Sequence, residues 1–82
     1  WKNKTINLTV TEFLLVKSLA ENVGVVKSRD QLIISAFGED KENIDDRAID
    51  HHFKRIRKKF KSTDNNFNSI VTVYGGGYKF SE

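Results

Sequence analysis

The stretch IDDRAIDHHFKRIRKKF, residues 44–60, carries six basic side chains and two histidines. At about 100° per residue of an α-helix, its apolar residues fall on one narrow side. These are Ile49, Phe53, Ile56 and Phe60. The opposite side collects Arg47, His51, Lys54, Arg55, Lys58 and Lys61. The stretch therefore predicts a helix over 44–61 that is buried on one side and basic on the other, with Asp45 or Asp46 as its N-cap.

The positive charge of the chain is concentrated in this predicted helix. Residues 44–61 hold seven basic and three acidic side chains. Residues 1–43 hold six of each kind, and residues 62–82 hold one basic and two acidic side chains. Such a distribution is typical of a protein that binds a polyanion. A solvated face is the alternative, because lysines near a helix C-terminus complement the macrodipole by about 0.3–1 kcal/mol. On the outward side, only Asp50 and Lys54 have the spacing of an i,i+4 ion pair.

Two shorter helices are expected before this stretch. Thr9 with Glu12, and Ser28 with Gln31, have the spacing of capping boxes. The first helix is predicted over about 10–22, and the second ends at Gly38. The apolar arc of the first helix comprises Phe13, Leu15, Val16, Leu19 and Ala20. The apolar positions of the second are Leu32, Ile33, Ala36 and Phe37.

Strands are expected at both ends of the chain. Residues 1–8 alternate weakly and predict a strand, the last of a sheet that continues upstream. β-Branched residues over 70–74 predict another strand, the glycines at 75–77 allow a tight reversal, and 78–80 returns as its partner. The predicted fold is α+β, mainly α: a single domain over 1–82 in which a helix-turn-helix is followed by a hairpin wing.

Nothing in the sequence indicates catalysis or a metal site. The chain has no cysteine, which excludes disulfides and thiolate metal sites. His51 and His52 are adjacent, so they diverge by about 100° and cannot chelate one metal from one helix face. No helix follows Gly75–Gly77, so a hairpin turn explains these glycines better than a phosphate loop. We expect no enzyme activity, no cofactor, no small-molecule substrate and, without a long apolar run, no membrane span.

Several motifs resemble the DNA-binding effector domain of OmpR/PhoB-type response regulators, over about residues 8–80. They are Leu8-Thr9 with Glu12-Phe13, Ser28-Arg29-Asp30-Gln31-Leu32, Asp46-Arg47, Asp50 with His52, Arg55 with Arg57, and Gly75, Gly77 and Tyr78. The resemblance implies a winged helix-turn-helix that binds double-stranded DNA sequence-specifically, dimerising on direct repeats in the bacterial cytoplasm. It also implies that RNA polymerase can contact the loop 38–43. The chain would then be a fragment of a two-component phosphorelay protein, with a receiver domain upstream and a truncated N-terminal sheet.

The resemblance also assigns DNA contacts to particular positions. The matching positions are Arg47, His52, Lys54, Arg55 and Arg57 in the long helix and Thr72 in the wing. His51 stands where the family often has a hydrophobic residue, and its outward direction allows it to read a base. Ala48 replaces a common threonine but keeps a methyl group for contact with thymine. Tyr74 replaces the common wing arginine, so the wing lacks the usual cation for the minor groove, while Lys58 is expected to neutralise a phosphate.

Three alternatives remain open at this point. Arg57 lies close to the apolar side of the predicted helix and could anchor the structure rather than bind DNA. His52 could pack at the edge of the core. For the domain as a whole, the alternative to DNA binding is a protein-interaction module whose basic helix docks on an acidic partner.

Overall fold

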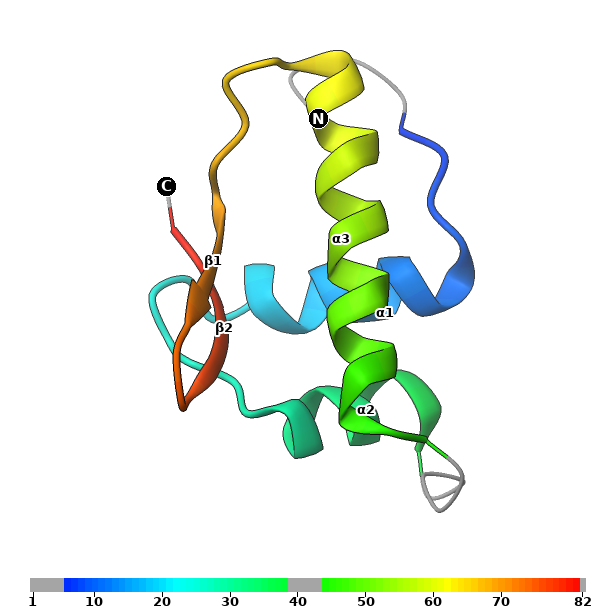
Figure 1. Cartoon of the computed structure of the whole chain (residues 1–82), viewed down its shortest axis with the longest axis vertical. Coiled ribbons are helices and arrows are strands. Elements are labelled where there is room, and N and C mark those ends of the chain that lie inside the picture. Colours follow the sequence, from blue (N-terminus) through cyan, green and yellow to red (C-terminus); the bar gives the residue numbers. More distant parts are fainter. Residues whose placement is uncertain (1–5, 39–43, 82) are drawn as a thin grey trace.

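The computed structural model describes residues 6–38 and 44–81 (Figure 1). Its elements are α1 (Val10–Ala20), α2 (Arg29–Phe37), α3 (Asp46–Thr63), β1 (Ile70–Val73) and β2 (Gly77–Phe80). Three helices followed by an antiparallel hairpin confirm the predicted winged helix-turn-helix. A strand was predicted over residues 1–8, but residues 6–9 belong to no helix or strand. The prediction is therefore wrong for residues 6–8. The remainder of that prediction, and residues 39–43 of the predicted polymerase loop, lie outside the described residues.

Both predicted capping boxes are present. Thr9 Oγ1 accepts from the Glu12 N–H at 3.1 Å, and Glu12 Oε1 accepts from the Thr9 N–H at 2.9 Å. Ser28 and Gln31 exchange the equivalent bonds at 3.2 and 2.9 Å. These bonds satisfy N–H groups that have no partner in the first turn, and they therefore determine where α1 and α2 begin. The first helix ends at Ala20, earlier than expected.

The N-cap of α3 is Asp45, the residue directly before the helix. Asp45 Oδ1 accepts from the Arg47 N–H at 2.9 Å, whereas Asp46 is the first helical residue. The predicted apolar side of this helix lies at the centre of the core. Its members Ile49, Phe53, Ile56 and Phe60 are all buried. They pack with Leu15, Leu19, Leu32, Ile33, Phe67, Ile70, Tyr78 and Phe80.

The apolar arc predicted for α1 is too broad. Phe13 is 53% exposed and Ala20 is also exposed, whereas Leu15 and Leu19 are fully buried. The third buried residue of this helix is Glu12, which is polar. The helix thus packs through a narrow stripe, because its neighbours cover only one side of it.

The hairpin is joined to the helix-turn-helix by backbone bonds. β1 and β2 are antiparallel, with Val73 opposite Gly77. The Gly76 N–H donates to Val73 O at 2.9 Å, and Gly75 has a φ of 79°, which fits a type II turn that requires glycine at this position. Lys27, in the segment before α2, exchanges two backbone bonds with Tyr78, at 2.8 and 3.0 Å. The wing is therefore attached to the rest of the domain along β2.

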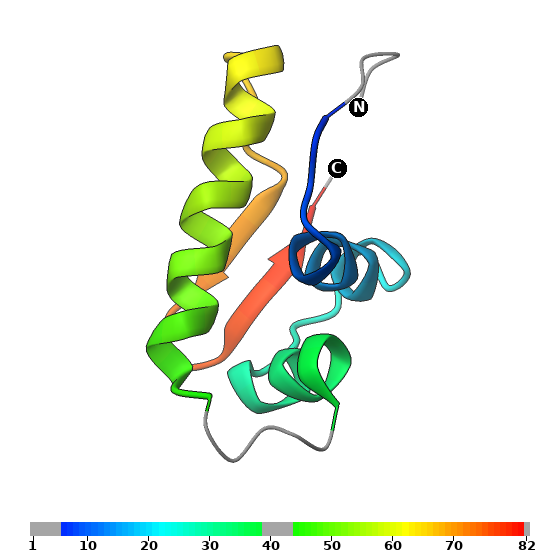
Figure 2. The ribbon, with the colours of Figure 1, turned by 90° about the vertical axis from the view of Figure 1, so that its right-hand side faces the viewer.

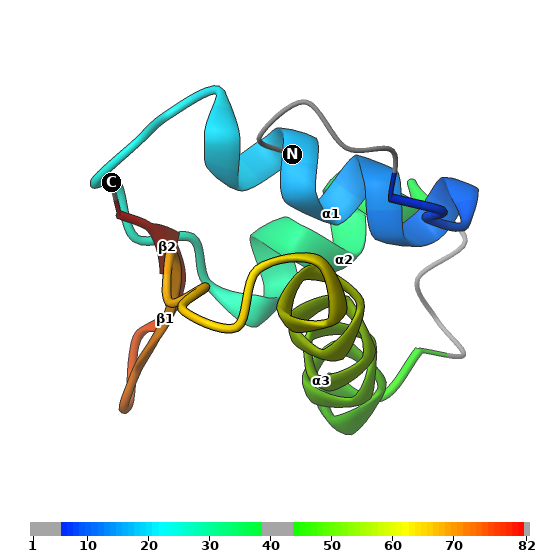
Figure 3. The ribbon, with the colours of Figure 1, turned by 90° about the horizontal axis from the view of Figure 1, so that it is seen from above.

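One side of α3 is left uncovered by the other elements. Figure 2 shows α1 and α2 on one side of α3 and the hairpin beside it. Seen from above, α3 and the tip of the hairpin project in the same direction, away from α1 (Figure 3). The helix and the wing can therefore meet the same extended ligand.

Candidate nucleic-acid interface

The uncovered side of α3 is basic, as the sequence predicts. Its exposed side chains are Arg47, His51, Lys54, Arg55, Lys58 and Lys61. Among residues 6–38 and 44–81, no carboxylate forms an ion pair with Arg47, Lys54 or Arg55. Exposed cations without a carboxylate partner attract a polyanion and release its counterions on binding. Ala48 is half-buried on the same helix.

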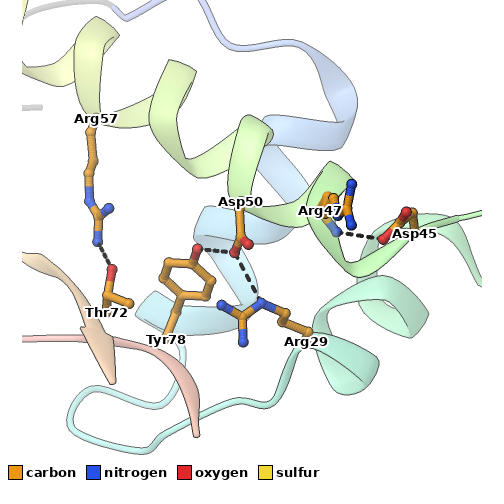
Figure 4. Close-up of polar contacts among 7 residues, drawn as sticks. All are labelled: Arg29, Asp45, Arg47, Asp50, Arg57, Thr72 and Tyr78. Atoms are coloured by element: carbon orange, nitrogen blue, oxygen red, sulfur yellow. Dashed lines mark hydrogen bonds and ion pairs between the residues drawn. The ribbon is translucent and has the colours of Figure 1, made fainter. Parts of the chain in front are cut away.

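Asp50 does not pair with Lys54, although the spacing suggested it. Its Oδ1 instead accepts from Arg29 Nε at 3.0 Å and from the Tyr78 hydroxyl (Figure 4). Hydrogen bonds to a charged group contribute about 1.5–3 kcal/mol each, whereas an exposed i,i+4 pair contributes about 0.2–0.5 kcal/mol. Burial alone would raise the pKa of Asp50, but the bonds from Tyr78 and Arg29 outweigh it and hold this pKa below its ordinary value.

Arg57 holds the hairpin against α3. Its Nε and Nη2 donate to Ile70 O at 3.2 and 2.9 Å, and Nη2 also donates to Thr72 Oγ1 at 2.8 Å (Figure 4). These bonds set the position of β1 relative to the helix. They support the structural interpretation of Arg57, and the DNA contacts of Arg57 and Thr72 remain predictions.

The flank of α3 that faces α1 and α2 is also occupied. Lys59 Nζ donates to Glu12 Oε1 at 2.5 Å, and the Glu12 side chain is only 2% exposed. The ring of His52 lies beside that of Phe37, with their centroids 5.9 Å apart. Burial, and then the charge of Arg55, lower the pKa of His52, so its imidazole is neutral at pH 7. His52 therefore lies at the edge of the core, and its DNA contact stays a prediction.

Tyr74 occupies the tip of the wing and is 96% exposed. It follows Val73 at the end of β1 and precedes the positive-φ Gly75. Because the ring packs against almost nothing in the domain, it contributes little to the fold. Its place at the tip, which projects in the same direction as α3 (Figure 3), suits the predicted wing contact with DNA.

The tertiary partners that shape this interface were not predicted from the sequence. Glu12 was assigned only to a cap, yet it precedes Leu15 and Leu19 by three and seven residues and so shares their buried face. That shared face is a usable signal for a buried ion pair. Arg29 and Tyr78 carry no comparable signal, because they reach Asp50 from positions 21 and 28 residues away.

Two negative findings apply to the part of the chain that the structure describes. No group of three or more potential metal ligands occurs there. None of its helices combines the length and the apolar character that crossing a membrane requires.

Known proteins with similar sequences are transcription regulators. Residues 3–80 match the family described as "Transcriptional regulatory protein, C terminal". The transcriptional regulatory protein BaeR of Escherichia coli O6:H1 (strain CFT073) is 40% identical over 80 residues, which are 98% of this chain and 33% of BaeR. The uncharacterized transcriptional regulatory protein YclJ of Bacillus subtilis (strain 168) is 45% identical over 76 residues, 93% of this chain and 32% of YclJ. The chain spans about a third of the length of these curated relatives.

Three solved DNA-binding domains have folds similar to that of this chain. The DNA-binding domain of CpxR from E. coli has a TM-score of 0.81 and 32% identity, and the match covers 100% of this chain and 79% of that solved domain. The DNA-binding domain of AdeR in complex with an intercistronic region has a TM-score of 0.80 and 25% identity, and the match covers 94% of this chain and 77% of that solved chain. The Klebsiella pneumoniae RstA DNA-binding domain in complex with the RstA box has a TM-score of 0.78 and 28% identity, and the match covers 96% of this chain and 77% of that solved chain.

These likenesses cover almost the whole chain, and the family is one of regulators rather than enzymes. The chain therefore belongs to the C-terminal transcriptional regulatory family, the winged-helix effector domains of OmpR/PhoB-type response regulators.

Proposed function

We propose that this domain binds double-stranded DNA sequence-specifically, with α3 in the major groove and the hairpin as a wing beside it. The observation that carries the proposal is the uncovered basic face of α3, whose two flanks are already held by Arg57 and Lys59. A helix fits the major groove of B-DNA, and its N-terminal half reaches base edges there. The complexes of the AdeR and RstA domains with DNA support this function over docking on an acidic protein.

The positions on the basic face are given different roles. Arg55 donates to a guanine or a phosphate, while His51 and Ala48 help to read bases. Arg47, Lys54 and Lys58 neutralise phosphates. Thr72 and Tyr74 contact the DNA backbone from the wing.

Further proposals concern the protein to which this domain belongs, and they follow from the resemblance to OmpR/PhoB-type response regulators. The protein would have a phosphoacceptor receiver domain upstream and would be located in the cytoplasm. Two copies would bind together at direct repeats, and RNA polymerase would contact the region of residues 38–43. The length of the curated relatives, about three times that of this chain, supports the presence of another domain.

Fluorescence anisotropy titrations test the proposal directly. The chain is titrated with a duplex obtained by library selection, a random duplex, a single strand and polyglutamate, at several salt concentrations. We expect the selected duplex to bind most tightly, with log affinity falling by about 0.9 per log unit of salt for each phosphate neutralised. Tight binding to polyglutamate but not to duplex, or a duplex complex that is insensitive to salt, would contradict the proposal.

A matched pair of variants locates the binding face. Lys58→Ala should weaken binding to all duplexes alike and reduce the salt slope by about 0.9. Lys17→Ala removes another exposed lysine, which belongs to α1 and not to the basic face of α3, and should leave affinity and slope unchanged. Equal effects of the two changes would show that α3 is not the binding face.

A further inference from the structure

We infer that Asp50 determines sequence specificity: its Oδ2 accepts a hydrogen bond from the amino group of a cytosine or adenine in the major groove. This inference rests on the proposed function of α3. It assigns a base-reading role to an acidic residue on a helix whose predicted contacts are otherwise basic or neutral.

Of the two oxygens of the Asp50 carboxylate, only one is occupied by the part of the protein that the structure describes. The bonds from Arg29 Nε and from the Tyr78 hydroxyl both end on Oδ1 (Figure 4). Within residues 6–38 and 44–81, no donor forms a hydrogen bond with Oδ2. The side chain is 44% exposed. The carboxylate therefore retains an acceptor that a ligand can reach.

The position of Asp50 places this acceptor among the DNA-facing residues. It lines an open hollow of about 260 Å³ together with Arg47, His51 and Lys54. Asp50 is three residues after Arg47 and four before Lys54, so the three side chains lie on neighbouring turns of one helix surface. This surface belongs to the N-terminal half of α3, the half that reaches base edges when such a helix enters the major groove.

The chemistry of a carboxylate restricts what Asp50 can contact. It repels phosphates, so it gains nothing from the DNA backbone. Since the bonds from Tyr78 and Arg29 hold its pKa below the ordinary value, the group stays ionised and can only accept hydrogen bonds. In the major groove, cytosine N4 and adenine N6 are amino donors, whereas guanine and thymine present acceptors at the corresponding positions.

The acceptor is also held rigidly, which favours discrimination between bases. The Tyr78 ring that donates to Oδ1 stacks on Phe53, with centroids 4.2 Å apart. The Arg29 guanidinium carbon lies 5.7 Å from the centre of the same ring. Because the carboxylate is oriented before DNA arrives, little side-chain freedom is lost on binding, and a base without an amino group leaves Oδ2 desolvated and unpaired.

Selection from a randomised duplex library tests the inference with the chain and its Asp50→Asn variant. Asparagine keeps a carbonyl oxygen for Arg29 and Tyr78 and places an amino donor where Oδ2 stands. We expect the chain to prefer cytosine or adenine at one position by roughly fivefold or more. The variant should prefer guanine or thymine there, because these bases present acceptors. Lys54→Gln, which changes another residue of the same hollow, should weaken all duplexes and keep the original preference.

A second measurement needs no variant. In the selected duplex, the cytosine or adenine at that position is replaced by 2-pyrimidinone or purine, which lack only the amino group. The affinity of the unmodified chain should fall roughly fivefold or more. An unchanged affinity, or an Asp50→Asn variant that folds and selects the same bases everywhere, would overturn the inference and leave DNA binding intact. A chain that selects no sequence at all would overturn the proposed function as well.

Discussion

Lys59 of α3 and Glu12 of α1 join two helices through an Nζ–Oε1 distance of 2.5 Å, although they lie 47 positions apart in the chain. The same Glu12 oxygen accepts from the Thr9 N–H and so closes the cap of α1. One buried carboxylate therefore fixes both the start of a helix and its position against α3. Breaking one partner of such a pair leaves a buried charge without compensation, which is costly.

Lys59→Met should lower the free energy of unfolding by about 1–3 kcal/mol, because Glu12 loses its cation while remaining buried. Lys58→Met, one residue away and exposed, should change it by less than about 0.5 kcal/mol. Urea denaturation of the two variants measures the difference. Equal losses would show that the Glu12–Lys59 pair does not stabilise the fold.

Acid should destabilise the domain through Glu12. Burial alone would raise its pKa, but the bonds and charge of Lys59 and the bonds from Thr9 outweigh burial and lower the pKa from its ordinary value of 4.5. The folded state therefore holds this proton less tightly than the unfolded state does. Its stabilising contribution is present above about pH 4.5 and is lost as the pH falls through the lower folded pKa. Melting temperatures from pH 7 to pH 3 should fall less steeply for Glu12→Gln than for the unchanged chain, and parallel curves would refute this role.

Alkali should act through Tyr78. Burial, followed by donation to Asp50 and the charge of that carboxylate, raises the pKa of Tyr78 from 10.0 to about 12. The resulting stability is fully present below pH 10 and is lost as the pH rises from 10 to 12, by about 3 kcal/mol. Tyr78→Phe removes this loss but keeps the ring. Urea denaturation between pH 9 and 12 compares the two chains, and tyrosinate absorbance in a Tyr74→Phe background reports the titration of Tyr78 alone. A midpoint near pH 10 would contradict the expectation.

Gly75 in the turn and Gly77 at the start of β2 should differ sharply in their tolerance of alanine. A Cβ at Gly77, where φ is 125°, would lie 2.0 Å from Lys27 O, the backbone oxygen that accepts from the Tyr78 N–H. Gly77→Ala should therefore cost more than about 3 kcal/mol, because both the backbone and the bridge to Lys27 must move. Gly75 also has a positive φ, but a Cβ added there would have no other atom within 4 Å. Gly75→Ala should therefore lower the free energy of unfolding by only about 1–2 kcal/mol. Similar melting temperatures for the two variants would contradict this.

Arg55 and Arg57 should separate DNA binding from stability. Arg55 is exposed on the basic face, so Arg55→Ala should cost about 1–3 kcal/mol of binding and relax the preference at one position, with little change in unfolding. Arg57→Ala removes the bonds to Ile70 O and Thr72 Oγ1 and should lower stability by about 1–3 kcal/mol. Anisotropy titration and urea denaturation of both variants test the division. A stable Arg57→Ala domain with a binding defect alone would reverse the assignment.

Local patterns were sufficient for most of the architecture. The capping boxes of Thr9 and Ser28, the buried residues of α3 and the glycine turn of the wing were all predictable, because each depends on residues within one or two turns of the chain. The expected arc of α1 failed at Phe13, since periodicity identifies residues that could be buried but not how much of the helix its neighbours cover.

The partners of the α3 flanks depend on contacts between distant segments. The sequence spacing suggested an ion pair between Asp50 and Lys54, but in the fold Asp50 accepts hydrogen bonds from Arg29 and Tyr78. Arg57 donates to the backbone of β1. Sequence periodicity determines which side chains leave the helix together, because it follows from helix geometry alone. The elements that then approach each flank are set by the packing of the whole core, and that packing decides which charges are neutralised inside the protein and which remain for DNA.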